Sequence, residues 1–154
     1  MFRYSACGVE LRSDVPLPSL ALASAREAHE PHLALRTSAV PFEEPSRWLY
    51  NERIEETQEP WRAVGLSPSG YLVRLFGRAD FFLAHGSHEA RVFVAAGAAA
   101  AVVEPLFLEQ ALPLWLSLLG RPCLHASAVV WGEGDSARII AFAGRSRSGK
   151  STLA

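Results

Sequence analysis

The chain has 154 residues, of which 49% are apolar and 20% are charged, and this balance is typical of a globular protein with its own core. The net charge of -1 excludes the basic surface of a nucleic-acid-binding protein. Cys7 and Cys123 form no metal-ligand pattern, so we expect two reduced thiols in a cytoplasmic protein.

Two further observations argue against a membrane protein. Residues 1–7 lack the apolar core of a signal peptide. The apolar runs at 92–103 and 106–119 are shorter than the roughly 20 residues needed to span a bilayer, and Pro113 with polar neighbours interrupts the second run. We therefore expect a soluble protein without a membrane partner.

The first hundred residues predict a small, mostly antiparallel β domain. Stretches rich in aromatic and β-branched residues alternate there with proline and glycine turns. We expect residues 19–31 to form a short helix or a loop. The proline- and glutamate-rich residues 41–60 should form an irregular connection anchored by Trp48 and Tyr50. The expected strands lie at 2–12, 33–37, 71–76, 80–85 and 91–94.

The hydrophobic period changes at residues 104–119 to that of a helix, apolar on nearly all sides and therefore buried. Pro105 suits the first helical turn and Gly120 suits the end. Pro113 should kink or split the helix, because proline lacks an N–H group. The remaining expected elements are a strand at 123–131, a turn at 132–135 and a strand at 137–143.

The chain then carries the phosphate-binding P-loop pattern Gly-x4-Gly-Lys-Ser, from Gly144 to Ser151. The glycines allow successive backbone N–H groups to point at phosphate oxygens. Lys150 can reach the β- and γ-phosphates, and the Ser151 hydroxyl can ligate Mg²⁺. An expected strand before the motif and a helix starting after it supply the strand–loop–helix order that the motif requires. The expected nucleotide-binding residues are Gly144, Arg145, Ser146, Arg147, Ser148, Gly149, Lys150, Ser151 and Thr152.

Two arginines within the motif leave alternatives open. Arg147 stands where many P-loops carry glycine, and it is strained by about 1 kcal/mol or more if the backbone there needs a positive φ. Arg145 and Arg147 either contact nucleotide phosphates or are solvated loop residues. The P-loop pattern itself allows any residue at position 147.

His125 lies on the expected strand that precedes the P-loop strand. It is either a packed core histidine or a side chain close to the phosphates, because neighbouring strands of such a sheet bring their ends to one edge. Two histidine pairs, His85 with His88 and His29 with His32, have the short spacing of metal ligands. Neither pair has a third ligand in view, so we expect no metal there.

Residues 124–130, the turn after them and residues 140–154 resemble the HPr kinase/phosphorylase-like family of serine kinases. They are most similar to the bacterial HPr-kinase-related proteins. Residues 4–20, with Gly8 and the run Pro16-Leu17-Pro18, also resemble the opening of those proteins. The resemblance covers the two ends of the chain and is vague between them.

This resemblance implies a P-loop kinase core similar to phosphoenolpyruvate carboxykinase, which transfers phosphate from ATP to a serine with Mg²⁺. It implies that His125 and Lys150 are the candidate catalytic residues, His125 near the bound phosphate and Lys150 in contact with it. Ser151 takes the magnesium side. Arg147 departs from the family's usual glycine.

The expected fold class is therefore α+β or α/β. A small, mostly antiparallel β domain over 1–103 precedes the start of a P-loop kinase core over 104–154. In the resembling family, the acidic general base and the second metal-binding acid lie beyond the P-loop helix, and phosphoryl transfer needs such groups. We therefore expect a truncated chain that is inactive alone.

The expected activity of the full-length protein is ATP-dependent phosphorylation of a serine, or of another hydroxyl group, on a protein, peptide or small molecule. Expected partners are ATP, Mg²⁺ and that acceptor, without nucleic acid, and homo-oligomer formation stays open. Two alternatives remain. One is another P-loop NTPase, such as a transporter ATPase or a GTPase. The other is a non-catalytic module in which residues 1–100 recognise a partner and the P-loop is vestigial.

Overall fold

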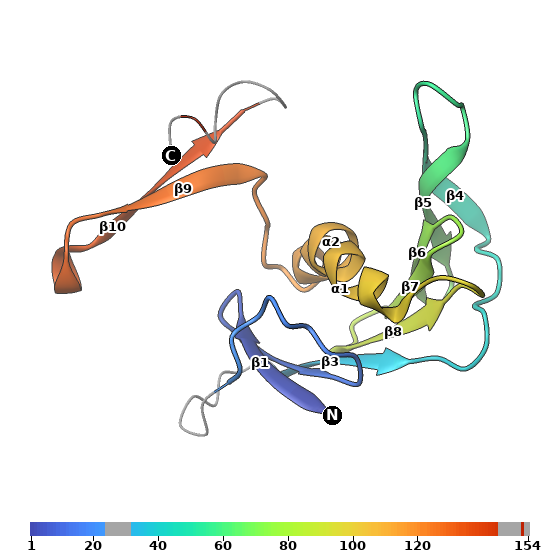
Figure 1. The fold of residues 1–154 in the computed structure, drawn as a ribbon, viewed down its shortest axis with the longest axis horizontal. Coiled ribbons are helices and arrows are strands. Elements are labelled where there is room, and N and C mark those ends of the chain that lie inside the picture. The colour runs from blue at the N-terminus through green and yellow to red at the C-terminus, as the bar shows by residue number, and fades with distance from the viewer. Residues whose placement is uncertain (24–31, 145–151, 153–154) are drawn as a thin grey trace.

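A computed structural model describes residues 1–23, 32–144 and 152 of the chain. These residues form one eight-stranded sheet, one two-stranded sheet and one helical segment (Figure 1). The strand order in the large sheet is β1-β2-β3-β8-β7-β6-β5-β4. Its strands are β1 (Phe2–Ala6), β2 (Val9–Ser13), β3 (His32–Thr37), β4 (Arg47–Arg53), β5 (Pro60–Ser67), β6 (Gly70–Leu75), β7 (Ala79–Ala84) and β8 (Glu89–Val94).

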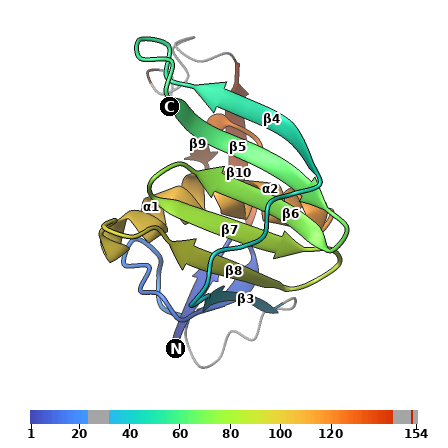
Figure 2. The same ribbon diagram turned by 90° about the vertical axis from the view of Figure 1, so that its right-hand side faces the viewer.

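The large sheet is mixed rather than mostly antiparallel. Strand β3 is parallel to both of its neighbours, β2 and β8, whereas the other neighbouring pairs are antiparallel. Strands β4 to β8 form a meander, in which each strand pairs with the next along the chain (Figure 2). The last strand of this meander returns beside β3, and this return produces the second parallel pair.

The helical segment runs from Ala100 to Leu118 and changes its winding three times. A 3₁₀ turn (Ala100–Val102) leads into α1 (Val103–Leu106), a π-helical turn (Phe107–Ala111) follows, and α2 (Leu112–Leu118) ends the segment. Pro113 has no N–H group to donate to the carbonyl four residues earlier, and the chain widens into the π turn just before it. The prediction that Pro113 interrupts the helix is confirmed.

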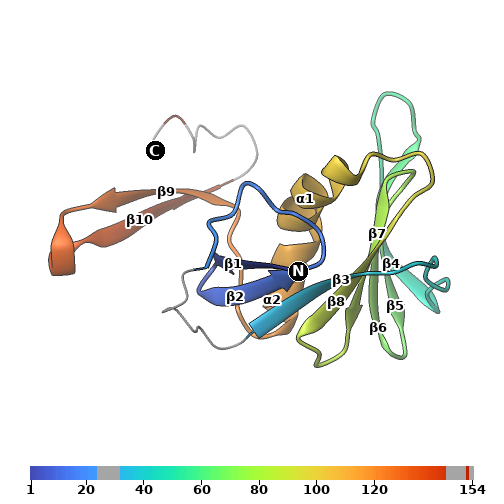
Figure 3. The same ribbon diagram turned by 60° about the horizontal axis from the view of Figure 1, so that its bottom comes forward.

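The core lies between this helical segment and the large sheet, which curves around the helix with β1–β2 on one side and β5–β7 on the other (Figure 3). Along β7 the pattern alternates, with Phe81 buried against the helix and Phe82 on the opposite face. Phe107 packs between Phe81 and Trp115, with ring centroids 5.9 and 6.4 Å away. The helical segment that we expected to open a second domain therefore shares the core of the first sheet.

By length and composition alone, the helix Ala100–Leu118 is apolar enough to cross a membrane. In the structure this helix packs in the core that it shares with the sheet. Its buried residues there include Val103, Phe107, Ala111 and Trp115. A core helix of a globular domain passes the same test.

The outer face of the sheet, away from the helix, is crossed by residues 38–46 on their way from β3 to β4 (Figure 2). Phe42 stacks on Phe82 with ring centroids 5.6 Å apart, and the Pro45 ring packs where a side chain on Gly65 would otherwise lie. A glycine at position 65 is therefore required by this close approach. The connection is held by specific contacts.

The expected fold class, α+β or α/β with the start of a P-loop kinase core, is wrong for the described residues, which are mostly β. Strands β9 (Ala126–Trp131) and β10 (Arg138–Ala143) form an antiparallel two-stranded sheet of their own. The connection at 132–137 is far too short for the helical crossover that parallel neighbours need, so the strands can only fold back on each other.

Two local expectations are also corrected. The single strand expected at 2–12 is two strands, β1 and β2, separated by the turn Cys7–Gly8. The region 41–60 contains an ordered strand, β4, paired with β5. Trp48 and Tyr50 lie on β4, where the guanidinium groups of Arg74 and Arg62 sit 5.4 and 5.1 Å from the respective ring centroids.

The β9–β10 hairpin extends away from the rest of the structure (Figures 1 and 3). Both of its faces carry apolar side chains that are largely open to solvent, with Trp131 on one face 71% exposed and Ile139 on the other 75% exposed. Runs of apolar residues without alternation are typical of strands covered on both faces. Within the described residues, neither face of this hairpin is covered.

One buried carboxylate lies in the N-terminal part of the sheet. Glu10 on β2 is 1% exposed and accepts hydrogen bonds from Arg3 Nη2 at 2.6 Å and Arg12 Nε at 2.8 Å. His32 Nδ1 on β3 lies 3.5 Å from its Oε1 atom. The hydrogen bond from Arg3, followed by that from Arg12, lowers the pKa of Glu10 to about 2 from an ordinary value of 4.5.

We expect the substitution Glu10→Gln to remove an acid-sensitive part of the stability. Because the folded pKa is depressed, the carboxylate stabilises the fold fully above about pH 4.5 and loses this effect as the pH falls towards about 2. The wild type should therefore exceed Glu10→Gln in urea midpoint at pH 6 to 7, and the gap should close in that acid window. The exposed Glu56→Gln variant should show no such gap, and a Glu10→Gln gap independent of pH would contradict the prediction.

Candidate functional site

Most of the predicted P-loop lies outside the described residues. The structure describes Gly144 and Thr152 but not Arg145, Ser146, Arg147, Ser148, Gly149, Lys150 or Ser151. Gly144 follows β10 directly, so the motif begins where this strand ends. The nucleotide-binding role of these residues stays a prediction.

His125 comes directly before β9, and not within a strand as expected. Ala126 pairs with Ala143 in the antiparallel register of the hairpin. The residue before Ala126 and the residue after Ala143 therefore leave the hairpin at the same end. These residues are His125 and Gly144, so the hairpin register brings the candidate histidine to the start of the P-loop. We expected His125 to lie near the P-loop because parallel strands end at one edge of a sheet. In the structure, His125 and Gly144 lie at one end of an antiparallel hairpin instead.

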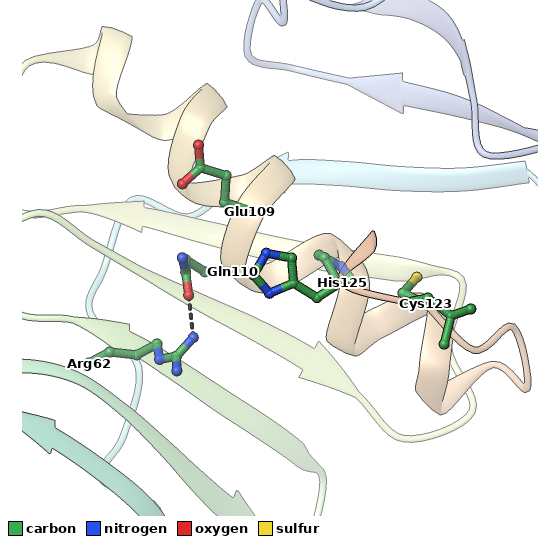
Figure 4. Close-up of a pocket in the computed structure, with 7 residues that line it drawn as sticks. Arg62, Glu109, Gln110, Cys123 and His125 are labelled. Atoms are coloured by element: carbon green, nitrogen blue, oxygen red, sulfur yellow. Dashed lines mark hydrogen bonds between the residues drawn. The ribbon is translucent and has the colours of Figure 1, made fainter. Parts of the chain in front are cut away.

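A cleft of about 580 Å³ opens beside His125, between β5, the π-helical turn and the segment leading to β9 (Figure 4). This volume is within the range of roughly 300–1,000 Å³ found for small-molecule sites. Figure 4 shows the His125 ring directed towards Gln110, with Arg62 beyond it. The residues that line the cleft are Arg62, Glu109, Gln110, Pro113, Cys123, Leu124 and His125.

Arg62 is the basic side chain of this cleft. It lies on the helix-facing side of β5, opposite Leu75 of β6, and its Nη1 atom donates a hydrogen bond to Gln110 Oε1. Its Nη2 atom forms an ion pair with Glu52 at 3.0 Å. Its Nε atom is buried without a hydrogen-bond partner. Gln110 and Glu52 therefore fix the position of the guanidinium, and its Nε–H donor has no hydrogen-bond partner.

The π-helical turn determines which helix residues reach the cleft. Glu109 and Gln110 both lie within it, and the wider winding changes their angular positions relative to a regular α-helix. Gln110 turns towards Arg62, whereas the Glu109 carboxylate projects away from it (Figure 4). The cleft thus combines a guanidinium, a carboxylate, an amide, a thiol and an imidazole with the apolar surfaces of Pro113 and Leu124. Such a lining suits a small polar group attached to an apolar body.

In the described part of the chain, no group of three or more His, Cys, Asp or Glu side chains is placed to hold a metal ion. His85 packs edge-on against Tyr71, with ring centroids 5.2 Å apart. His32 lies beside Glu10, and His29 lies outside the described residues.

Sequence reasoning missed Arg62 and Gln110. A weak signal for Arg62 exists in β5, where the alternation of Val64 and Leu66 places position 62 on the same, helix-facing side. An arginine that faces the core needs a hydrogen-bond or ion-pair partner, because burying an unpaired charge is unfavourable. Gln110 carries no comparable signal, because its direction depends on the π turn.

Comparison with known proteins gives no relatives for this chain: no protein-family model, no curated protein and no solved structure matches it.

Proposed function

We propose that this chain binds ATP with Mg²⁺ through residues 144–152 and takes part in phosphoryl transfer to the hydroxyl group of a serine, as in the HPr-kinase-related proteins that it resembles. Lys150 contacts the β- and γ-phosphates, and Ser151 would hold the metal ion, which neutralises phosphate charge. The acceptor is a serine-bearing protein or peptide, and the setting is cytoplasmic.

The observation that carries this proposal is the use of lysine in the chain. Lys150 is the only lysine among 15 basic residues, and all the others are arginine. The one lysine stands at the one position where the P-loop pattern calls for a compact ammonium group. A chain that otherwise uses arginine would place lysine there by chance about once in 15 times, taking the two residues as interchangeable.

The register of the hairpin adds support from His125. An imidazole at the start of a phosphate-binding loop can donate a hydrogen bond to a phosphate oxygen or exchange a proton with an acceptor hydroxyl. The cleft beside His125 is the proposed acceptor site, because its size fits a small group and it carries polar side chains next to His125.

The single lysine makes a direct test practical. The chain contains two kinds of amine, the Lys150 side chain and the α-amino group of Met1, and both react with an acetylating reagent. We expect ATP with Mg²⁺ to slow acetylation of Lys150 several-fold and to leave Met1 unchanged, as read by mass spectrometry. Adenosine, which lacks phosphates, should give no protection.

The outcomes separate the proposal from its alternatives. Equal reaction of Lys150 with and without ATP would refute nucleotide binding at the motif. Protection by GTP but not ATP would indicate a GTPase. Binding of a partner by residues 1–100 that does not depend on phosphate would favour a binding module with a vestigial P-loop.

A further inference from the structure

Cys7 occupies an unusual backbone position. It forms, with Gly8, the two-residue turn between β1 and β2, and both residues have positive φ, 53° and 71°. Such turns favour Asn-Gly or Asp-Gly, because a side chain at positive φ is strained. Among the described non-glycine residues, only Gln58 shares this conformation. A cysteine at the exposed tip of a tight hairpin therefore needs an explanation other than turn propensity.

The segment that precedes β9 touches this turn. Arg121 Nη1 donates a hydrogen bond to the carbonyl oxygen of Gly8 at 3.3 Å, and Arg121 is two residues before Cys123. Figures 1 and 3 show the β1–β2 turn beside the chain that leaves α2. Both thiols are free and exposed. The fold thus brings the turn that carries Cys7 into contact with the segment that carries Cys123.

An electrostatic effect agrees with this proximity. Partial burial, followed by the nearby Cys7 thiol, raises the pKa of Cys123. The raised pKa also lowers the thiolate fraction of Cys123 at neutral pH.

We propose that Cys7 and Cys123 are a redox modification site, at which a reversible disulfide ties the β1–β2 turn to the segment before β9. The reactant is a low-molecular-weight disulfide such as oxidised glutathione. In a reducing cell such a bond is transient and forms when the glutathione pool becomes oxidised.

The exchange takes place in two balanced steps. The Cys7 thiolate attacks one sulfur of oxidised glutathione, forms a mixed disulfide and releases one glutathione thiolate, which takes up a proton. The Cys123 thiol then loses its proton, and its sulfur attacks the Cys7 sulfur and releases the second glutathione. The protein loses two protons and two electrons, which together equal two hydrogen atoms, and the glutathione disulfide gains them.

The bond would act on the cleft described above, because Cys123 lines it two residues before His125. In the reduced chain the segment 121–125 is held to the turn by the Arg121 hydrogen bond. A disulfide would add a covalent link to this hydrogen bond and would fix the segment 121–125 along one side of the cleft. This consequence does not depend on nucleotide binding.

The test is equilibration of the folded chain with oxidised glutathione, followed by thiol counting and mass spectrometry. We expect both thiols to disappear, with the loss of two hydrogen atoms and no bound glutathione. Trypsin does not cut Arg121–Pro122, so the linked peptides should be Tyr4–Arg12 and Val92–Arg138. Dithiothreitol should restore both thiols.

The single variants Cys7→Ser and Cys123→Ser are the matched controls, since each leaves one exposed thiol and changes no core residue. Each should stop at a mixed disulfide that carries one glutathione. The proposal is overturned if the wild-type chain also stops at mixed disulfides, keeps its thiols free, or links only between two molecules.

Discussion

The variant Lys150→Ala is expected to bind ATP–Mg²⁺ about 30- to 150-fold more weakly than the wild type. The substitution removes an ionic hydrogen bond to phosphate, a contact that contributes about 2–3 kcal/mol. Isothermal titration calorimetry of the whole chain measures the affinity directly. No other lysine in the sequence can take over the contact.

Two further variants make this result specific. Lys150→Arg keeps the charge but replaces the compact ammonium with a planar fork, so its affinity should lie between those of wild type and alanine variant. Arg138→Ala removes an exposed positive charge from β10, six residues before the motif, and should bind as the wild type does. An equal loss in Arg138→Ala would show that net charge, and not the motif, governs binding.

Local sequence patterns predicted the central meander well. The strands expected at 71–76, 80–85 and 91–94 correspond to β6, β7 and β8, because alternation and turn residues both act within a few positions. The helix expected at 104–119 is present for the same reason. Its apolar residues on nearly all sides predicted that it is buried, and its core residues pack on the sheet.

The errors arose where pairing over long distances decides the structure. Nothing local indicates that β3 is parallel to both β2 and β8, since this depends on where the meander returns. The Cys7–Gly8 turn was missed because cysteine is not a typical turn residue. The kinase-core fold class was inferred from a motif whose surroundings differ here, because β9 and β10 form a separate hairpin.

The candidate site was predictable only in part. The P-loop pattern and His125 come from short sequence signals, and the hairpin register brings Gly144 and His125 to one end. The cleft depends on Arg62, from β5, and Gln110, from the π turn, which are far apart in the chain. No short pattern relates two such residues, so their pairing needed the fold.

The second large predicted effect is a loss of stability on substitution of Trp115, which lies between the helix and the large sheet. Trp115 is 1% exposed, its ring packs on Phe107, and its Nε1–H donates to the carbonyl oxygen of Ser87 at 3.2 Å. We expect Trp115→Ala to lower the free energy of unfolding by about 3–5 kcal/mol, because it leaves a large cavity and an unpaired carbonyl. Urea unfolding followed by circular dichroism measures this change independently of the other tryptophans.

Trp131→Ala is the matched comparison, because Trp131 on β9 is 71% exposed and packs on neither the helix nor the large sheet. Its truncation should change the unfolding free energy of the core by less than about 0.5 kcal/mol. Trp115→Phe keeps an aromatic ring and loses the N–H group. Its loss of unfolding free energy should therefore lie between those of Trp115→Ala and Trp131→Ala. If Trp115→Ala and Trp131→Ala were equally destabilising, the hairpin and the core would unfold as one cooperative unit. The packing of Trp115 between helix and sheet would then contribute no more to stability than the exposed Trp131 does.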